Sequence, residues 1–115
     1  MKSIYDQFDA AFANVSAYAI SIDGEHVARV AIKYPQDGAG RLYAYVHILG
    51  GQMVRGSATG YGYDKRSAAV VDAAGKLTGD ESYCAALFKR TLAKDGGYEW
   101  TTYLEKAGFT VDQVI

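Results

Sequence analysis

A chain of 115 residues has the usual size of one domain and is too short for two domains with separate cores. Half of its residues are hydrophobic and 22% are charged, which is typical of a folded globule and excludes a disordered tail. The 12 basic residues against 13 acidic ones give a formal net charge of -1, which disfavours a protein that holds nucleic acid by a general excess of positive charge.

Cysteine usage and hydropathy favour a cytoplasmic protein. Cys84 is the only cysteine, so no disulfide can form within the chain and an oxidising compartment is not implied. The N-terminal residues lack the apolar stretch of a signal peptide. No apolar run approaches the roughly 20 residues that a membrane helix needs, so we expect no contact with a membrane.

The first expected element is a helix over residues 3–13. Ser3 and Asp6 have the spacing of a capping box, in which each side chain accepts a hydrogen bond from the other residue's backbone N–H. Apolar residues at intervals of four predict one stripe along this helix, formed by Ile4, Phe8 and Phe12.

Alternating residues over 17–59 predict four antiparallel strands. Asp23-Gly24 and Gly50-Gly51 are the residue pairs that tight two-residue hairpins prefer, and they join the first strand to the second and the third to the fourth. One face of the resulting meander is apolar. The other carries small, basic and tyrosine side chains, with Tyr43, Tyr45 and His47 on the third strand.

Helical spacing dominates residues 65–107. The first helix of this half is expected to turn Ala68, Val71 and Val70 inward. Residues 109–115 alternate weakly and fit either a final strand or a capped tail. The predicted fold is a single α+β domain over 1–115, in which a four-stranded antiparallel meander is packed on one face by helices.

Glycines alternate with aromatic residues where the sheet gives way to the helical half, and we call residues 60–66 the elbow. It carries Tyr61, Tyr63, Lys65 and Arg66 just before and within a helix start, where free N–H groups and the helix dipole favour an anion. The alternative is a sharp turn for which glycine is needed, with Asp64 as the helix cap.

No catalytic or metal-binding pattern is visible, so we expect neither an enzyme nor a cofactor. His26 and His47 lie on different strands without Cys, Asp or Glu at the spacing of metal ligands. No order of Ser, His and Asp or of Cys and His suggests a nucleophile. Cys84 lies on an apolar helix stripe, which is typical of a small core residue.

The stretch from Tyr43 to Leu77 resembles the last strands and second helix of a double-stranded-RNA-binding domain, which joins them by Gly-x-Gly-x-Ser-Lys-Lys-x-Ala-Lys. The matching positions are Gly60, Gly62, Lys65, Arg66, Ala68, Ala73 and Leu77. The resemblance implies that the two basic residues contact phosphates. Asp64 stands where the family has serine and Ala69 where it has its third lysine, and the match covers under a third of the chain.

The string Gly-Tyr-Gly-Tyr-Asp-Lys-x-Ser-Ala-Ala, with a later Trp and a Gly-Phe-x-Val, is also similar to small orphan proteins of bacteriophages and other mobile elements. Some of these proteins inhibit host defence, as anti-CRISPR proteins do. The resemblance implies a cytoplasmic inhibitor in a host bacterial cell, whose partner is a host protein complex such as a CRISPR–Cas effector.

The leading hypothesis is therefore a non-enzymatic binding protein that blocks a host defence system by protein–protein contact. Tyrosines on strands suit this role because they lose little side-chain entropy on binding. The expected partner-binding residues are Tyr43, Tyr45, His47, Tyr61, Tyr63, Lys65 and Arg66. The alternative is a nucleic-acid-binding module like the double-stranded-RNA-binding domain, acting through Lys65 and Arg66.

Overall fold

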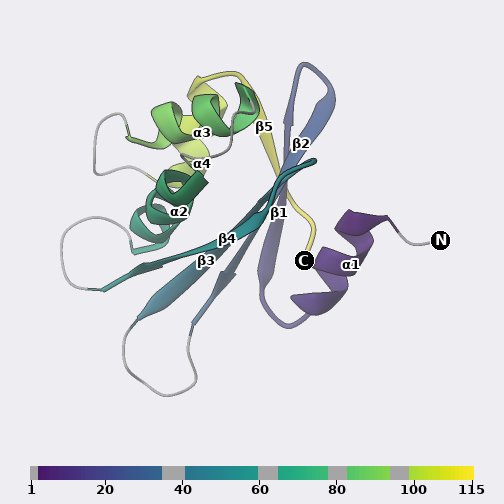
Figure 1. The fold of residues 1–115 in the computed structure, drawn as a ribbon, viewed down its shortest axis with the longest axis vertical. Coiled ribbons are helices and arrows are strands. Elements are labelled where there is room, and N and C mark those ends of the chain that lie inside the picture. The colour runs from purple at the N-terminus through teal and green to yellow at the C-terminus, as the bar shows by residue number, and fades with distance from the viewer. Residues whose placement is uncertain (1–2, 35–40, 60–64, 78–82, 94–98) are drawn as a thin grey trace.

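The computed structural model describes residues 3–34, 41–59, 65–77, 83–93 and 99–115. They form a five-stranded antiparallel sheet in the order β4-β3-β2-β1-β5 and four helices (Figure 1). The strands are β1 (Ser16–Ile22), β2 (Glu25–Lys33), β3 (Leu42–Ile48), β4 (Met53–Ala58) and β5 (Phe109–Gln113). The helices are α1 (Ile4–Ala11), α2 (Lys65–Lys76), α3 (Tyr83–Ala93) and α4 (Trp100–Lys106).

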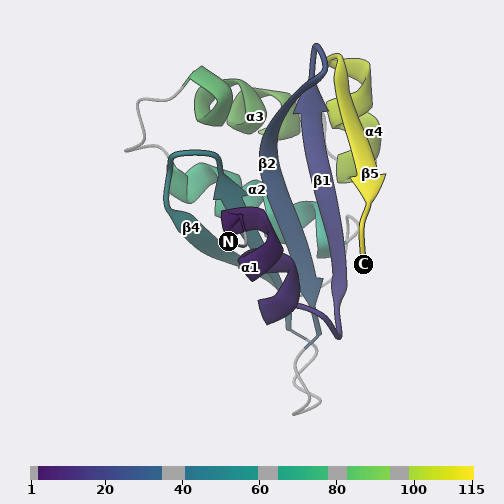
Figure 2. The same ribbon diagram turned by 90° about the vertical axis from the view of Figure 1, so that its right-hand side faces the viewer.

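The α+β class and the antiparallel meander of β1 to β4 are confirmed, and two features differ from the prediction. The C-terminal segment is a fifth strand, which pairs antiparallel with β1 from Ile22–Phe109 to Tyr18–Gln113. The helices also occupy both faces of the sheet: α2, α3 and α4 cover one face and α1 lies on the other (Figures 1 and 2). Among the described residues, no helix is long and apolar enough to cross a membrane.

Both predicted hairpin turns contain the backbone that their residues favour. Asp23 and Gly24 have φ angles of 51° and 78°, the left-handed conformation that a tight turn between twisted strands requires. Gly50 likewise has a φ of 78°. The turns therefore set the register in which β1 pairs with β2 and β3 with β4.

The main core lies between the sheet and α2, α3 and α4. Phe88 of α3, Leu104 of α4 and Val70 of α2 are each fully buried there, against the strand positions that alternation assigns to the apolar face. The core residues of the strands include Ile20, Val30, Val46 and Ile48. Such burial contributes about 25 cal/mol for each Å² of apolar surface removed from water.

Gly56 of β4 explains how closely α2 approaches the sheet. A Cβ added at this glycine would overlap the carbonyl oxygen of Ala69 and the backbone nitrogen of Ala73. Small residues of α2 are accordingly the ones that turn inward. Val70 is buried as predicted, but Ala68 and Val71 are only half-buried, because the side of α2 that faces the sheet carries Ala69, Val70, Ala73 and Ala74 at helical spacing.

The N-terminal helix begins as the sequence predicts, since Ser3 and Asp6 form both hydrogen bonds of the capping box. Its apolar stripe is different. Ile4 is 53% exposed, whereas Tyr5 and Phe8 are buried. The buried line therefore advances by three and then four residues, from Tyr5 to Phe8 to Phe12, which keeps it on one side of a helix with 3.6 residues per turn.

The outer edge of β4 is bonded to side chains of α2. The carboxylate of Asp72 accepts a hydrogen bond from the Ser57 backbone N–H at 2.9 Å, and the Lys76 ammonium donates to the Arg55 carbonyl at 2.9 Å. Asp72 and Lys76 also pair with each other at 3.3 Å, one helical turn apart. These bonds fasten α2 to the border of the sheet as well as to its face.

Candidate binding face

The face of the sheet that carries α1 has three rows of side chains across β2, β3 and β4. Residues paired between antiparallel strands point to the same face, so the register defines each row. The rows are Lys33–Tyr43–Ser57, Ala31–Tyr45–Arg55 and Arg29–His47–Met53. Alternation correctly predicted that Tyr43, Tyr45 and His47 share this face.

Helix α1 lies across part of these rows (Figure 2). Phe8 packs with Ala17 and Ala31 in a small cluster of buried residues. The Phe12 ring lies 4.9 Å from the Tyr45 ring, centroid to centroid. The prediction of helices on one face leaves this face uncovered, but it is covered at Tyr45, because the aromatic side chains of α1 and Phe12 need an apolar surface to pack on.

Arg29 of β2 anchors α1 by its charge. Its guanidinium donates two hydrogen bonds to the carboxylate of Asp9, at 3.0 Å and 3.3 Å, and lies 4.9 Å above the centre of the Tyr5 ring. The Arg29 side chain is 12% exposed and that of Asp9 is 22% exposed, so solvent screens this pair less than a surface ion pair. One strand residue thus fixes two residues of the helix.

An irregularity in β2 brings His26 to the same anchor. The pairing of β1 with β2 shifts between Ile20 and Ser21, so that Val27 is an extra residue in β2. In a regular strand His26 and Arg29 would point to opposite faces, since they are three residues apart. With the bulge, the His26 ring stacks on Tyr5 at 4.1 Å and accepts a hydrogen bond from Arg29.

His47 is buried beneath α1, with 6% of its surface exposed. Its ring meets those of Tyr5 and Phe8 at centroid distances of 5.6 Å and 6.1 Å. Burial lowers the pKa of His47 below its ordinary value of 6.5, and burial together with the charge of Arg29 lowers that of His26. His47, a predicted partner-binding residue, thus belongs to the α1 contact and is not exposed.

Two polar atoms at this contact are buried without a hydrogen-bond partner among the described residues, the Tyr5 hydroxyl and Nδ1 of His47. Burial also raises the pKa of Tyr5 above 10.0. An unpaired buried polar group costs about 1–3 kcal/mol. The α1 contact is therefore less favourable than its aromatic area alone would make it.

Tyr43 and Arg55 lie on the part of the face that α1 leaves exposed. The Arg55 guanidinium lies 5.0 Å above the centre of the Tyr43 ring, and no described carboxylate pairs with it. Arg55 is exposed, and Met53, two residues before it on β4, is 51% exposed. Arg55 and Met53 are not among the predicted binding residues, although their alternation with Val54 places both on the face of Tyr43.

Lys65 and Arg66, the described residues of the elbow, lie apart from the α1-bearing face of the sheet that carries Tyr43 (the Tyr43 face). Tyr61 and Tyr63 fall outside the described residues. Lys65 and Arg66 form the first turn of α2, which packs on the opposite face of the sheet. Arg66 pairs with Glu99 at 3.2 Å, so a carboxylate already lies against its guanidinium. The structure thus brings Tyr43, Tyr45 and His47 together but places Lys65 and Arg66 elsewhere.

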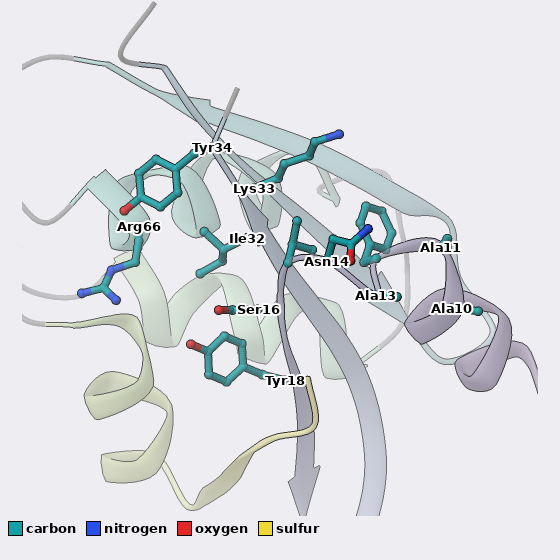
Figure 3. A pocket seen from close by; sticks show the side chains of 12 residues that line it. Ala10, Ala11, Ala13, Asn14, Ser16, Tyr18, Ile32, Lys33, Tyr34 and Arg66 are labelled. Atoms are coloured by element: carbon teal, nitrogen blue, oxygen red, sulfur yellow. The ribbon is translucent and has the colours of Figure 1, made fainter. Parts of the chain in front are cut away.

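Arg66 instead lines a hollow of about 540 Å³ at the end of β1 and β2. Figure 3 shows the side chains of Tyr18, Ile32 and Arg66 around it, with Tyr34 beside Arg66, while Lys33 extends away from Arg66. The Tyr18 ring meets Trp100 edge-on at 5.0 Å. This hollow combines hydroxyl and guanidinium groups, and its described lining contains no His, Cys, Asp or Glu side chain.

The comparisons with known proteins name no relative: no protein-family model, no curated protein and no solved structure matches this chain. Within the described residues, no group of three or more His, Cys, Asp or Glu side chains lies close enough together to hold a metal ion. The candidate site therefore rests on its own geometry, and what that geometry offers is a surface of aromatic, basic and apolar side chains.

Proposed function

We propose that this chain is a non-enzymatic binding protein that holds a protein partner on the exposed part of the Tyr43 face. The supporting observation is that the Arg55 guanidinium lies over the Tyr43 ring and that exposed Met53 lies two residues before Arg55 on the same strand. Tyrosine, arginine and methionine are the residue types that protein interfaces favour, and a sheet holds them rigidly before a partner arrives.

The resemblance to proteins of phages and other mobile elements gives the proposal its specific form, an inhibitor of a host defence complex. Inhibition by contact needs a preorganised surface and no chemistry, which suits a chain in whose described residues no group of His, Cys, Asp or Glu could hold a metal ion. If the chain is such an inhibitor, a CRISPR–Cas effector is one partner to test. Expression of the chain in a host with that effector should then restore plaque formation by a phage that the effector targets.

The test is capture of a partner from a bacterial lysate on the immobilised chain, followed by its identification and by measurement of affinity for variants. Tyr43→Ala is expected to weaken binding about tenfold or more, because interface tyrosines often contribute 2 kcal/mol or more. Tyr83→Ala is the matched control, since Tyr83 is 73% exposed on α3, in the layer on the other side of the sheet. Equal effects of the two changes would contradict the proposal.

The second candidate, binding of duplex RNA, is favoured by Lys65 and Arg66 in the first turn of α2. Glu99 competes with phosphate for Arg66, which weighs against it. Fluorescence anisotropy with a labelled RNA duplex tests it directly. Binding that weakens steeply with salt and is lost in the double variant Lys65→Ala/Arg66→Ala would replace protein binding as the proposed function.

A further inference from the structure

An apolar groove of about 370 Å³ lies between α1 and β4. Most of its walls are apolar, and they are formed by Ile4, Gln7, Phe8 and Ala11 of α1, Phe12 directly after it, buried His47 of β3 and Met53 of β4. Ile4 and Met53 are 53% and 51% exposed, although both are large apolar side chains. Exposed apolar side chains gathered around a concavity are typical of a surface that a partner covers.

The charge beside the groove has one sign. Arg55 follows Met53 by two residues on β4 and so lies next to it on the same face. The three rows across β2, β3 and β4 contain no acidic residue, so the rim of the groove is complementary to a carboxylate.

Helix α1 shows what kind of segment this face holds. Arg29 lies over the Tyr5 ring at 4.9 Å and binds Asp9, an acid on an amphipathic helix. Arg55 lies over the Tyr43 ring at 5.0 Å and has no described carboxylate to bind. The two arginines are thus alike in their aromatic contact and differ in that one already has its acid.

We infer that the groove seats an amphipathic helix of a protein partner, lying beside α1 over β3 and β4. Large apolar side chains at intervals of three and four enter between Ile4 and Met53, and a carboxylate of the same helix pairs with Arg55. Two helices on one face pack 8–10 Å apart, which places the second helix over β4. The inference rests on the proposed function and adds the chemical class of the partner segment.

Selection of helical peptides from a displayed random library on the immobilised chain tests this inference without a known partner. The expected peptides combine aromatic or large aliphatic residues at helical spacing with Asp or Glu. Met53→Glu and Arg55→Glu should each weaken the selected peptides about tenfold or more, the effect of a charge reversal or a buried charge at an interface. Arg90→Glu, an equal charge reversal on exposed α3, should leave their affinity unchanged.

Thermal unfolding of Met53→Glu and Arg55→Glu should match the parent chain, because both side chains are exposed. Peptides that bind all variants equally, or that lack acidic residues, would overturn the inference while leaving protein binding intact. Failure to select any peptide would also overturn it. Binding of a labelled single-stranded oligonucleotide that is lost in Arg55→Glu would assign the surface to nucleic acid instead.

Discussion

The two faces of the sheet are packed in different ways. On the side of α2, α3 and α4, 20 described residues form one buried apolar cluster, whereas on the side of α1 the corresponding cluster has only Phe8, Ala17 and Ala31. The α1 side depends instead on an ion pair, stacked rings and partly unpaired polar groups. Since apolar burial is the main source of stability, the helical side holds the fold together and the α1 side is the one free to specialise.

The largest expected loss of stability comes from a substitution at Gly56, where α2 packs on β4. In Gly56→Ala the new methyl group overlaps backbone atoms of Ala69 and Ala73, which cannot move without displacing α2. We expect a loss of about 4 kcal/mol or more in the free energy of unfolding. Urea denaturation measures it.

Gly75→Ala is the control for Gly56→Ala, because a methyl group at Gly75 within α2 meets no atom and removes a helix glycine. It should stabilise the chain by about 0.4–1 kcal/mol. A Gly56→Ala chain as stable as the parent would show that α2 does not need this close approach to β4.

Phe8→Ala tests the α1 side at its centre and should cost about 3 kcal/mol, the lower end for a buried phenylalanine, because the thin cluster around it can collapse. Hydrogen exchange should accelerate in α1 and leave the amides of α3 protected. Ile4→Ala, at a residue 53% exposed, should change stability by no more than about 0.5 kcal/mol. Equal acceleration in both helices of Phe8→Ala would mean that the two faces unfold as one unit.

Acidification should weaken the α1 side by a smaller amount. The folded chain keeps His26 and His47 neutral, with pKa values below 6.5, whereas the unfolded chain protonates them near that value. The unfolded state therefore binds more protons in this range. The contribution of the two neutral histidines to the free energy of unfolding is therefore complete above pH 6.5. It decreases as the pH falls from 6.5 toward the lowered pKa values of the folded state.

Denaturation between about pH 7 and about pH 5 measures this dependence. The groups that face the two histidines are Tyr5 and Asp9 of α1 and Arg29 of β2, and all three remain in a His47→Asn variant. That variant should lose part of the slope of stability against pH. An unchanged slope would assign the acid sensitivity to other groups.

Much of the local structure could be predicted from the sequence, because it depends on near neighbours. The capping box of Ser3 and Asp6 and the turn at Asp23-Gly24 both follow from short-range rules. The α1 side could not be predicted in the same way. No residue near Phe8 in the sequence indicates which face of the sheet its helix covers. That choice depends on contacts with strands that come later in the sequence.

The candidate site shows the same limit. Alternation put Tyr43, Tyr45 and His47 on one face, but the covering of His47 by α1 and the position of Arg55 over Tyr43 are tertiary contacts. The bulge at Val27 also has no local signal, since the alternation on either side of it looks regular. The close approach of α2 to Gly56 could not be predicted, because a glycine in a strand can indicate a bulge, a bend or a close contact with another backbone.

The bonds from Asp72 and Lys76 to the border of β4 have a consequence for self-association. Open-ended growth by strand pairing needs a receptive border on both sides of each molecule, so that every copy accepts two neighbours. Here the β4 border already has its Arg55 carbonyl and Ser57 N–H bonded to side chains of α2, so of the two edge strands β5 is the one left for pairing. Pairing through β5 alone would join one copy to another about a twofold axis and then stop, which would protect the chain from forming fibres at high concentration.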